Sequence, residues 1–171
     1  MYLINRTALQ SDSYLGRQVA ITLAALRQAD LDARLEGFEH RPGRHPFIGE
    51  HVGKWIDAAT GLWLASADPD LKRLLDQTVA RLVASQDEDG YLGTYEPALR
   101  CSAGFGAGWD VWTSKYCLIG LTSYHAATGD SAALDAARRL ADLLIRRFQP
   151  GSPSILRTDT HGGMASGSVL I

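Results

Sequence analysis

Three short stretches of the chain combine aromatic, polar and glycine residues directly before runs of apolar residues. They lie at 49–55, 109–116 and 160–168. The apolar runs are typical of buried helices, so each stretch is expected beside the start of such a helix. Flat rings pack on the C–H faces of polyols, while oxygen atoms accept hydrogen bonds from their hydroxyls. The three stretches therefore predict the rim of one pocket for an oxygen-rich ligand.

A further acidic stretch runs from Gln86 to Tyr91 and holds three acids, a glycine and a tyrosine. Composition alone is typical of a solvated turn. Its expected place at the same end as the pocket instead favours ligand binding. We predict Asp89 as an acceptor for hydroxyls and Tyr91 as a ring face for the ligand.

Trp112 is predicted to stack on a sugar, although the same ring can serve as a wedge between helices. His161 precedes a helix that opens with small residues, which leaves space for a hydrogen-bond partner; the alternative is a surface histidine at a helix start. Glu50 and Trp55 are weaker candidates, since the first can complete a helix start and the second can belong to the core. The predicted substrate-binding set is Glu50, Trp55, Asp89, Tyr91, Trp112 and His161.

No catalytic residue or metal ligand can be assigned from the residues themselves. The chain has no nucleophile elbow, no glycine-rich phosphate loop and no closely spaced metal-binding set. The carboxylate separation that distinguishes glycosidase mechanisms is a three-dimensional quantity, so it cannot be chosen here. Spacing and composition therefore predict a pocket and a ligand class without a reaction.

The overall composition excludes several classes of protein. Seventeen basic and nineteen acidic residues give a formal charge of -2, with no basic cluster for nucleic acid. No apolar run is long enough to span a membrane, and residues 1–13 do not resemble a secretory signal. The two cysteines, Cys101 and Cys117, form no disulfide or metal framework, which favours a reducing compartment. We therefore predict a cytoplasmic protein.

Helices of two kinds alternate along the chain. Residues 52–65 and 116–127 are apolar around nearly the whole helix, so both helices are predicted to be surrounded. The segments that follow, from Asp68 and from Asp130, each begin with a capping aspartate and then carry one apolar stripe and one charged face. Gly129 is expected to adopt the left-handed conformation that ends a helix.

This couplet repeats with a period of roughly 60 residues. Alternating buried and half-exposed helices predict an all-α fold, an (α/α)6-type toroid with inner and outer rings, present here as a partial barrel. Short links lie at 66–70 and 128–131, and long links at 87–111 and 149–160. The long links and the starts of the inner helices are predicted at one end, where function is expected.

The domain division places an outer-layer helix and connector at 1–48, and the first barrel hairpins at 49–171. Within the first part, a helix is predicted over 14–29 and a turn-rich connector over 41–46. A third buried helix is predicted to open at 162–171. Residues 91–95 alternate weakly and are compatible with a short hairpin.

Several motifs resemble those of glycoside hydrolase family 127, typified by β-L-arabinofuranosidase. They are Gly49–Trp55, Gln86–Tyr95, Tyr124–Asp130 and His161–Ser166. The resemblance implies a glycosidase with an (α/α)6 catalytic barrel followed by β-rich domains, which cleaves terminal β-L-arabinofuranosyl units or related sugars with retention. It also implies a cysteine nucleophile bound to zinc beside glutamate and other cysteines.

The zinc and nucleophile motifs belong to a later part of family sequences, so neither Cys101 nor Cys117 receives that role. Six hairpins at the period found here need roughly 300 residues. The chain is therefore expected to be a truncated and inactive barrel fragment, with the catalytic residues beyond Ile171. Where well-studied members carry His-Glu-Leu-Tyr, this chain has Thr113–Tyr116, which leaves the sugar open.

Two other functions remain open at this point. An unsaturated glucuronyl hydrolase or a sugar epimerase would use the same toroid, and a non-catalytic carbohydrate-binding or scaffold domain would need no reaction. The expected partner in every case is a carbohydrate, without nucleic acid or membrane. A homodimer of the full-length protein is also kept open.

Overall fold

The computed structural model describes residues 11–101 and 108–148. This part of the chain contains six α-helices, one short 3-10 helix and no strand. The elements are α1 (Tyr14–Arg27), α2 (Leu31–Glu39), α3 (Glu50–Ser66), α4 (Pro69–Ala84), η1 (Pro97–Leu99), α5 (Gly108–Thr128) and α6 (Ser131–Arg147). The predicted all-α class is confirmed.

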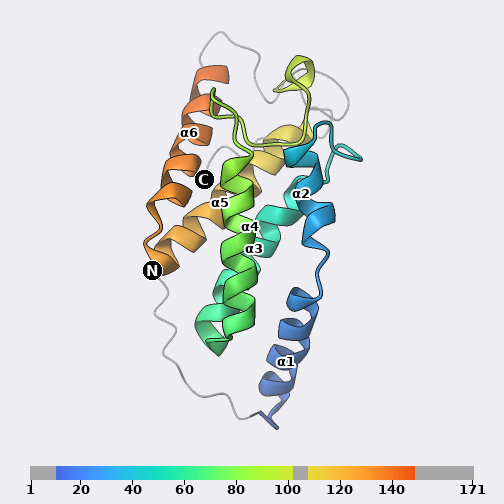
Figure 1. Cartoon of the computed structure of the whole chain (residues 1–171), viewed down its shortest axis with the longest axis vertical. Coiled ribbons are helices and arrows are strands. Elements are labelled where there is room, and N and C mark those ends of the chain that lie inside the picture. The colour runs from blue at the N-terminus through green and yellow to red at the C-terminus, as the bar shows by residue number, and fades with distance from the viewer. Residues whose placement is uncertain (1–10, 102–107, 149–171) are drawn as a thin grey trace.

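The helices form two layers. The buried pair α3 and α5 pack along each other, and α4 lies across them in Figure 1 with α6 beside α5. The core contains residues from both layers. The helices α4 and α6 therefore each bury one apolar face, and the opposite face is exposed to water. Its larger apolar members include Phe38, Val52, Trp55, Ile56, Leu71, Leu75, Leu82, Leu121 and Leu140. This is the alternation that the sequence predicted for a partial toroid.

Two aspartates begin the outer helices as predicted. The carboxylate of Asp68 accepts a hydrogen bond from the Leu71 amide at 2.8 Å, and that of Asp130 accepts one from the Ala133 amide at 2.9 Å. Each satisfies an amide that has no partner inside the helix. Gly129 has the predicted left-handed backbone, with φ at 77°. Ala67 occupies the corresponding position after α3 with φ at 55°.

The helix α2 was not predicted. Asp30 caps it by accepting a hydrogen bond from the Ala33 amide at 2.9 Å, and Leu35 and Phe38 bury its inner face. Its nine residues include Gly37, so the apolar period is short and interrupted. The predicted connector therefore begins only after a second helix in the first 48 residues, and α1 ends at Arg27 instead of at residue 29.

The buried helix predicted from Tyr116 begins eight residues earlier, at Gly108. Trp109 and Trp112 therefore lie within α5 and not ahead of it. Thr113 and Ser114 precede the predicted start, but both are buried in the helix, and the Ser114 hydroxyl donates to the Asp110 carbonyl at 3.1 Å. That local bond satisfies a polar side chain without breaking the helix.

The segment 91–95 forms no hairpin. It runs as an irregular loop, held by hydrogen bonds to side chains and to the Gly43 amide, which donates to the Thr94 carbonyl at 2.8 Å. The predicted helix at 162–171 and the link at 149–160 lie outside the described residues. Among the described helices none combines the length and apolar character needed to cross a membrane. The cytoplasmic location remains a prediction.

The helices α3 and α5 approach very closely where Gly53 faces Tyr116. A Cβ atom on Gly53 would lie 2.3 Å from the Tyr116 carbonyl carbon and oxygen, which belong to the backbone and cannot move aside. Gly120 meets the same contact from α5, since its Cβ would lie 2.8 Å from the Gly53 carbonyl oxygen. Both glycines are therefore required by backbone proximity and not by a turn.

We expect Gly53→Ala to lower the free energy of unfolding by about 1–3 kcal/mol, because the added methyl overpacks the contact. Gly61 provides a matched control in the same helix, since its Cβ position has no atom within 4 Å. Gly61→Ala should raise the stability by up to about 1 kcal/mol through helix propensity. Urea denaturation followed by circular dichroism measures both. Equal stabilisation by the two substitutions would show that the close contact is absent.

Candidate functional site

The first turns of α3 and α5 lie at the same end of the molecule as the 85–101 loop (Figure 1). Four aromatic rings gather there, which we call the aromatic cluster: Phe47, Trp109, Trp112 and Tyr116. Neighbouring ring centroids are 5.4, 6.4 and 5.4 Å apart in that order. Phe47 is exposed, and the other three rings are partly exposed. Ring faces at a surface can pack against the C–H groups of a ligand.

Glu50 joins the two inner helices at this end. Its Oε2 atom accepts a hydrogen bond from the Trp112 indole N–H, and its Oε1 atom lies 2.9 Å from the Lys54 ammonium. The residue is 9% exposed, so both contacts are partly shielded from water. A carboxylate has about four lone-pair positions. Glu50 therefore retains acceptor capacity for a hydroxyl at the cluster.

His51 stands next to this pair, with Nδ1 at 4.0 Å from Glu50 Oε1. Burial lowers the pKa of His51, and the nearby Glu50 carboxylate opposes that change without cancelling it. The neutral imidazole is thereby favoured. A neutral histidine can donate from one nitrogen and accept at the other, which suits a hydroxyl ligand.

Two ammonium groups lie over the rings of the cluster. Lys54 Nζ is 4.5 Å from the Tyr116 centroid, while Lys115 Nζ is 4.4 Å from the Trp112 centroid and 5.4 Å from that of Tyr116. These distances are within the range of cation–π attraction. The end of the α3–α5 pair thus combines ring faces, one carboxylate and two cations.

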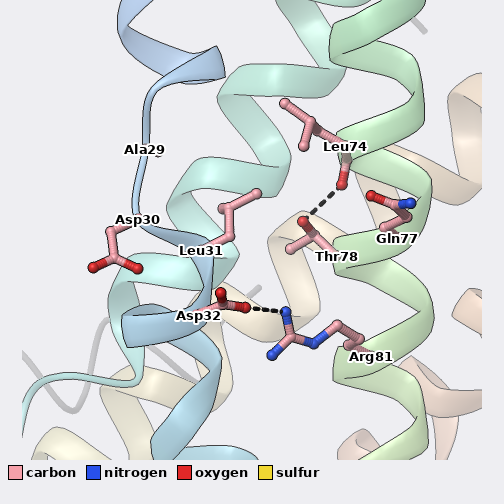
Figure 2. Close-up of a pocket in the computed structure, with 8 residues that line it drawn as sticks. All are labelled: Ala29, Asp30, Leu31, Asp32, Leu74, Gln77, Thr78 and Arg81. Atoms are coloured by element: carbon pink, nitrogen blue, oxygen red, sulfur yellow. Dashed lines mark hydrogen bonds and ion pairs between the residues drawn. The ribbon is translucent and has the colours of Figure 1, made fainter.

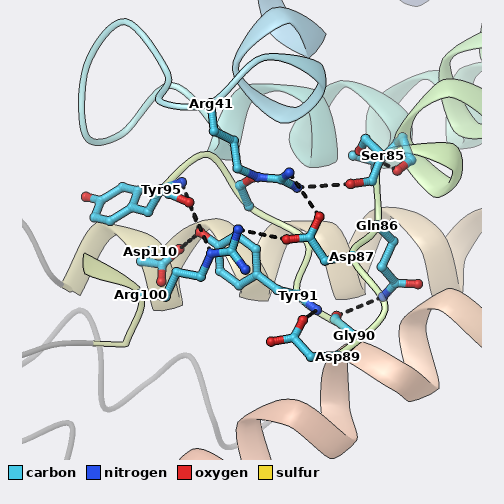
Figure 3. A network of polar contacts seen from close by, with 12 residues as sticks. Arg41, Ser85, Gln86, Asp87, Asp89, Gly90, Tyr91, Tyr95, Arg100 and Asp110 are labelled. Carbon is cyan, nitrogen blue, oxygen red and sulfur yellow. Dashed lines mark hydrogen bonds and ion pairs between the residues drawn. The ribbon is translucent and has the colours of Figure 1, made fainter. Parts of the chain in front are cut away.

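A separate buried network fixes the adjacent loop (Figure 3). The Tyr91 hydroxyl donates to Asp110 Oδ1 at 2.6 Å and accepts from the Tyr95 amide at 3.0 Å. The other Asp110 oxygen accepts from the Cys101 amide at 3.0 Å. One carboxylate in the first turn of α5 therefore holds the loop at two points.

Two arginines enclose this network. The Arg100 guanidinium lies 3.8 Å from the Tyr91 ring centroid, and that of Arg41 lies 5.4 Å from it. Both pair with Asp87, at 2.7 Å and 3.1 Å respectively. Arg41 also donates to the Ser85 and Gly93 carbonyls, both at 2.9 Å. The connector after α2 is thereby tied to both ends of the acidic stretch.

Burial sets the protonation of this network. It raises the pKa of Asp110, against the hydrogen bonds from Tyr91 and Cys101 that favour the carboxylate. Burial and the nearby Asp110 also raise the pKa of Tyr91, and they raise that of the Cys101 thiol to about 12. Cys101 is thus held as a thiol near neutral pH, which does not suit a nucleophile.

Comparison with known proteins gives the family. A family model described as "Beta-L-arabinofuranosidase, GH127 catalytic domain" matches residues 8–170. The chain belongs to glycoside hydrolase family 127. The match confirms the resemblance seen in the motifs.

Individual relatives agree with the assignment to family 127, one by sequence and one by fold. The chain is 29% identical over 125 residues to the non-reducing end β-L-arabinofuranosidase of Bifidobacterium longum, covering 67% of this chain and 18% of that one. A GH127 β-L-arabinofuranosidase from Geobacillus stearothermophilus T6 superposes with a TM-score of 0.63 at 23% identity, covering 88% of this chain and 26% of that one. The chain thus spans about a fifth to a quarter of these two relatives.

One further relative carries a different name. Human cytosolic carboxypeptidase 4 is 29% identical over 115 residues, covering 62% of this chain and 10% of that protein. A similarity confined to a tenth of that protein does not transfer its chemistry. The family 127 match covers nearly the whole chain and therefore decides the assignment.

The structure brings together two of the six predicted site residues of this family 127 chain, Glu50 and Trp112. Trp55 is instead a core residue, 4% exposed, whose indole N–H donates to the Leu26 carbonyl at 3.2 Å. His161 lies outside the described residues. Trp55 therefore fits its alternative role as packing, and the position of His161 stays a prediction.

The two ligand-binding predictions in the acidic stretch, Tyr91 and Asp89, have different outcomes. Tyr91 is 1% exposed and covered by Arg100, so its ring has no face free for a sugar. Its predicted stacking role is wrong because the ring is buried, with Arg100 nine residues later and Arg41 from 50 residues earlier lying over it. Asp89 is exposed, but one of its oxygens accepts from the Tyr91 amide at 2.9 Å, which closes a local turn.

The predicted set of site residues left out Tyr116 and Lys115, although both fall in the stretch 109–116 that was predicted to border the pocket. Their signal was present, because residues three and four positions after Trp112 must share its side of a helix. It went unused because the helix was predicted to start at Tyr116. Asp110 was also missed as the anchor of the loop, since nothing in the sequence identifies its partner Tyr91.

A shallow hollow of about 280 Å³ lies elsewhere, between the link that joins α1 to α2 and the side of α4 (Figure 2). Its polar groups are already engaged. The Thr78 hydroxyl donates to the Leu74 carbonyl at 2.7 Å, and Arg81 donates to Asp32 at 2.6 Å. This hollow belongs to the outer layer and is not part of the candidate site.

The described residues do not provide the zinc site that the family resemblance implies. Across 11–101 and 108–148, no group of three or more histidine, cysteine, aspartate or glutamate side chains is arranged to hold a metal ion. Asp110 and Cys101 are adjacent, but they lack a third such ligand within this part of the chain. We therefore derive no step through zinc.

The raised pKa of Asp110 predicts a specific pH dependence of stability. The folded state binds the Asp110 proton more tightly than the unfolded state, so stability falls as pH rises from the ordinary carboxyl range through the raised pKa. In Asp110→Asn this contribution is lost, and the wild-type chain should lose stability relative to the variant as pH rises. Denaturant midpoints across that pH range measure the difference.

Asp135→Asn is the control, because Asp135 is 67% exposed and pairs only loosely with Arg138 at 3.5 Å. This variant should keep the wild-type pH slope. A slope unchanged in Asp110→Asn would mean that Asp110 has an ordinary pKa in the folded chain.

Proposed function

We propose that this chain acts within a glycosidase that releases terminal β-L-arabinofuranosyl units or closely related sugars. Membership of family 127 is the observation that carries the proposal. The chain spans 18% of the Bifidobacterium enzyme, so its own contribution has to be sought in the part that it supplies. We propose that this contribution is one wall of the sugar-binding site.

The geometry at the helix starts supports that role. Trp112, Trp109 and Tyr116 offer ring faces of the kind that pack on the C–H side of a sugar. Glu50 offers acceptor positions for hydroxyls, and the Trp112 hydrogen bond holds its carboxylate in place. A positioned acceptor beside an aromatic face can fix both the identity and the orientation of a sugar ring.

The loop network supports the same wall from behind. Asp110 lies in the α5 turn that also carries Trp109 and Trp112, and it anchors the loop through Tyr91 and Cys101. The start of α5 is thus braced where it presents its rings. No catalytic residue is assigned within the described residues. The cysteine nucleophile, the zinc and a homodimer all remain predictions.

The activity is tested with a protein that contains the complete catalytic domain. Such a protein should hydrolyse an aryl β-L-arabinofuranoside and release L-arabinose, detected by chromatography. Aryl glycosides of other pentoses serve as the comparison. Hydrolysis of none of these substrates by a folded preparation would overturn the proposed function.

Trp112→Ala should lower kcat/KM in that assay by about 2- to 10-fold, since an aromatic contact is worth about 0.5–1.5 kcal/mol. Trp63→Ala is the matched control, because Trp63 lies near the far end of α3 and packs under Lys72 at 4.9 Å. It should leave kcat/KM close to that of wild type, because Trp63 lies far along α3 from the aromatic cluster. Full activity in the Trp112→Ala variant would show that this ring does not contact the substrate.

A further inference from the structure

The two lysines at the aromatic cluster differ in their charge partners. Lys54 is paired with Glu50 at 2.9 Å. Lys115 has its ammonium over Trp112 and Tyr116, and no carboxylate among residues 11–101 and 108–148 forms an ion pair with it. Lys72, the third lysine of the chain, has both kinds of partner, since it lies over Trp63 and pairs with Asp76 at 2.6 Å. Within the described residues, Lys115 therefore lies over rings without a carboxylate partner.

Lys115 lies on the open side of α5. Cys117, Leu121 and Tyr124 bury the side of this helix that faces the core. Trp112, Lys115 and Tyr116 are instead partly exposed, and they share one side because they are three and four positions apart. The Lys115 ammonium is thus held at the ring faces on which a sugar would pack.

The charges at this end do not balance. Around the aromatic cluster, Lys54 and Lys115 contribute two positive charges, against the single negative charge of Glu50. The other carboxylate in the first turns of α3 and α5, Asp110, is buried, and its oxygens accept from Tyr91 and Cys101. The helix starts add positive potential, since both inner helices direct their amide ends here. Burial lowers the pKa of His51 and favours its neutral form, so this side chain leaves the balance of charges unchanged. A neutral sugar would cover Lys115 without supplying a counter-charge, which is an unfavourable way to desolvate a cation.

We propose that the site accepts a sugar bearing a carboxylate, and that Lys115 determines this specificity. The carboxylate belongs either to the cleaved sugar or to a uronic acid linked to it. This inference rests on the proposed function, because it assigns a substrate class to the same site. Lys115 makes a charge-assisted hydrogen bond to the carboxylate, while Trp112 and Tyr116 pack on the ring.

The test compares two ligands that differ only in the charged group: methyl β-D-glucuronide and methyl β-D-glucoside. Both are titrated into the 171-residue chain, and binding is followed by NMR through the indole N–H signal of Trp112, assigned with Trp112→Phe. The glucuronide should bind about three- to tenfold more tightly at low salt, and this preference should shrink at high salt. An equal affinity for the two ligands, or binding of neither, overturns the proposal.

Variants separate Lys115 from a general charge effect. Lys115→Met keeps the length and apolar contacts of the side chain, so the variant should fold and lose the preference for the glucuronide. Lys115→Arg should retain most of that preference. Lys72→Met removes a lysine that is also held over aromatic rings, at the far end of the helices. This variant should keep the wild-type preference for the glucuronide. A preference that survives in Lys115→Met overturns the assignment of Lys115.

A parallel titration with methyl β-L-arabinofuranoside distinguishes the two proposals. If this neutral furanoside binds but the glucuronide gains nothing over the glucoside, the carboxylate inference fails and the proposed function stands. If the preference depends on Lys115 while the complete catalytic domain hydrolyses no arabinofuranoside, the proposed function fails and the carboxylate site stands. Circular dichroism of each variant checks that the helices are intact.

Discussion

The close contact between α3 and α5 is the constraint on which the rest of this structure depends. The Gly53 backbone lies directly against the Tyr116 carbonyl, and Gly120 returns the contact from the other helix. Side chains at either position would separate the helices. Because the axes approach so closely, the first turns lie side by side, and Glu50 can reach the indole of Trp112. The candidate site therefore depends on a backbone contact to which only Tyr116 of the aromatic cluster contributes.

The two carboxylates at this end of the molecule have different uses, set by their surroundings. Asp110 is 1% exposed, and its oxygens are taken by Tyr91 and Cys101 within the protein. Glu50 is less enclosed, is paired with a cation and borders partly exposed rings. A carboxylate that is fully buried can position other groups, whereas one at the edge of a surface can also accept from a ligand. Only Glu50 therefore belongs to the ligand-facing side.

The layered helices could be predicted because their causes are local. The apolar period of each helix and the capping residues Asp68, Asp130 and Gly129 are all visible in short windows of sequence. The start of α5 was predicted too late, because the polar run Thr113–Lys115 interrupts the apolar pattern of the sequence ahead of Tyr116, although Thr113 and Ser114 are buried within the helix. The prediction for Tyr91 is wrong for a long-range reason, since Arg41 supplies one of its covering groups from 50 residues earlier. Local sequence patterns thus predicted the helices, whereas long-range packing determined which side chains remain accessible to a ligand.

The same distinction explains why the ligand-facing residues could be found only in part. Glu50 is the first residue of α3 and Trp112 the fifth of α5, where a motif before an apolar run marks them in the sequence. The role of Lys115 depends on the absence of a carboxylate beside its ammonium among the described residues. That absence cannot be predicted from sequence, because folding determines which side chains lie next to the ammonium. The three lysines thus have two environments: Lys54 and Lys72 each lie over a ring and pair with a carboxylate, whereas Lys115 lies over rings and pairs with no carboxylate of the described residues. The proposed specificity for a charged sugar follows from the environment of Lys115. Its ammonium lies over rings without pairing with a described carboxylate, so a ligand that carries a carboxylate can supply the ion-pair partner.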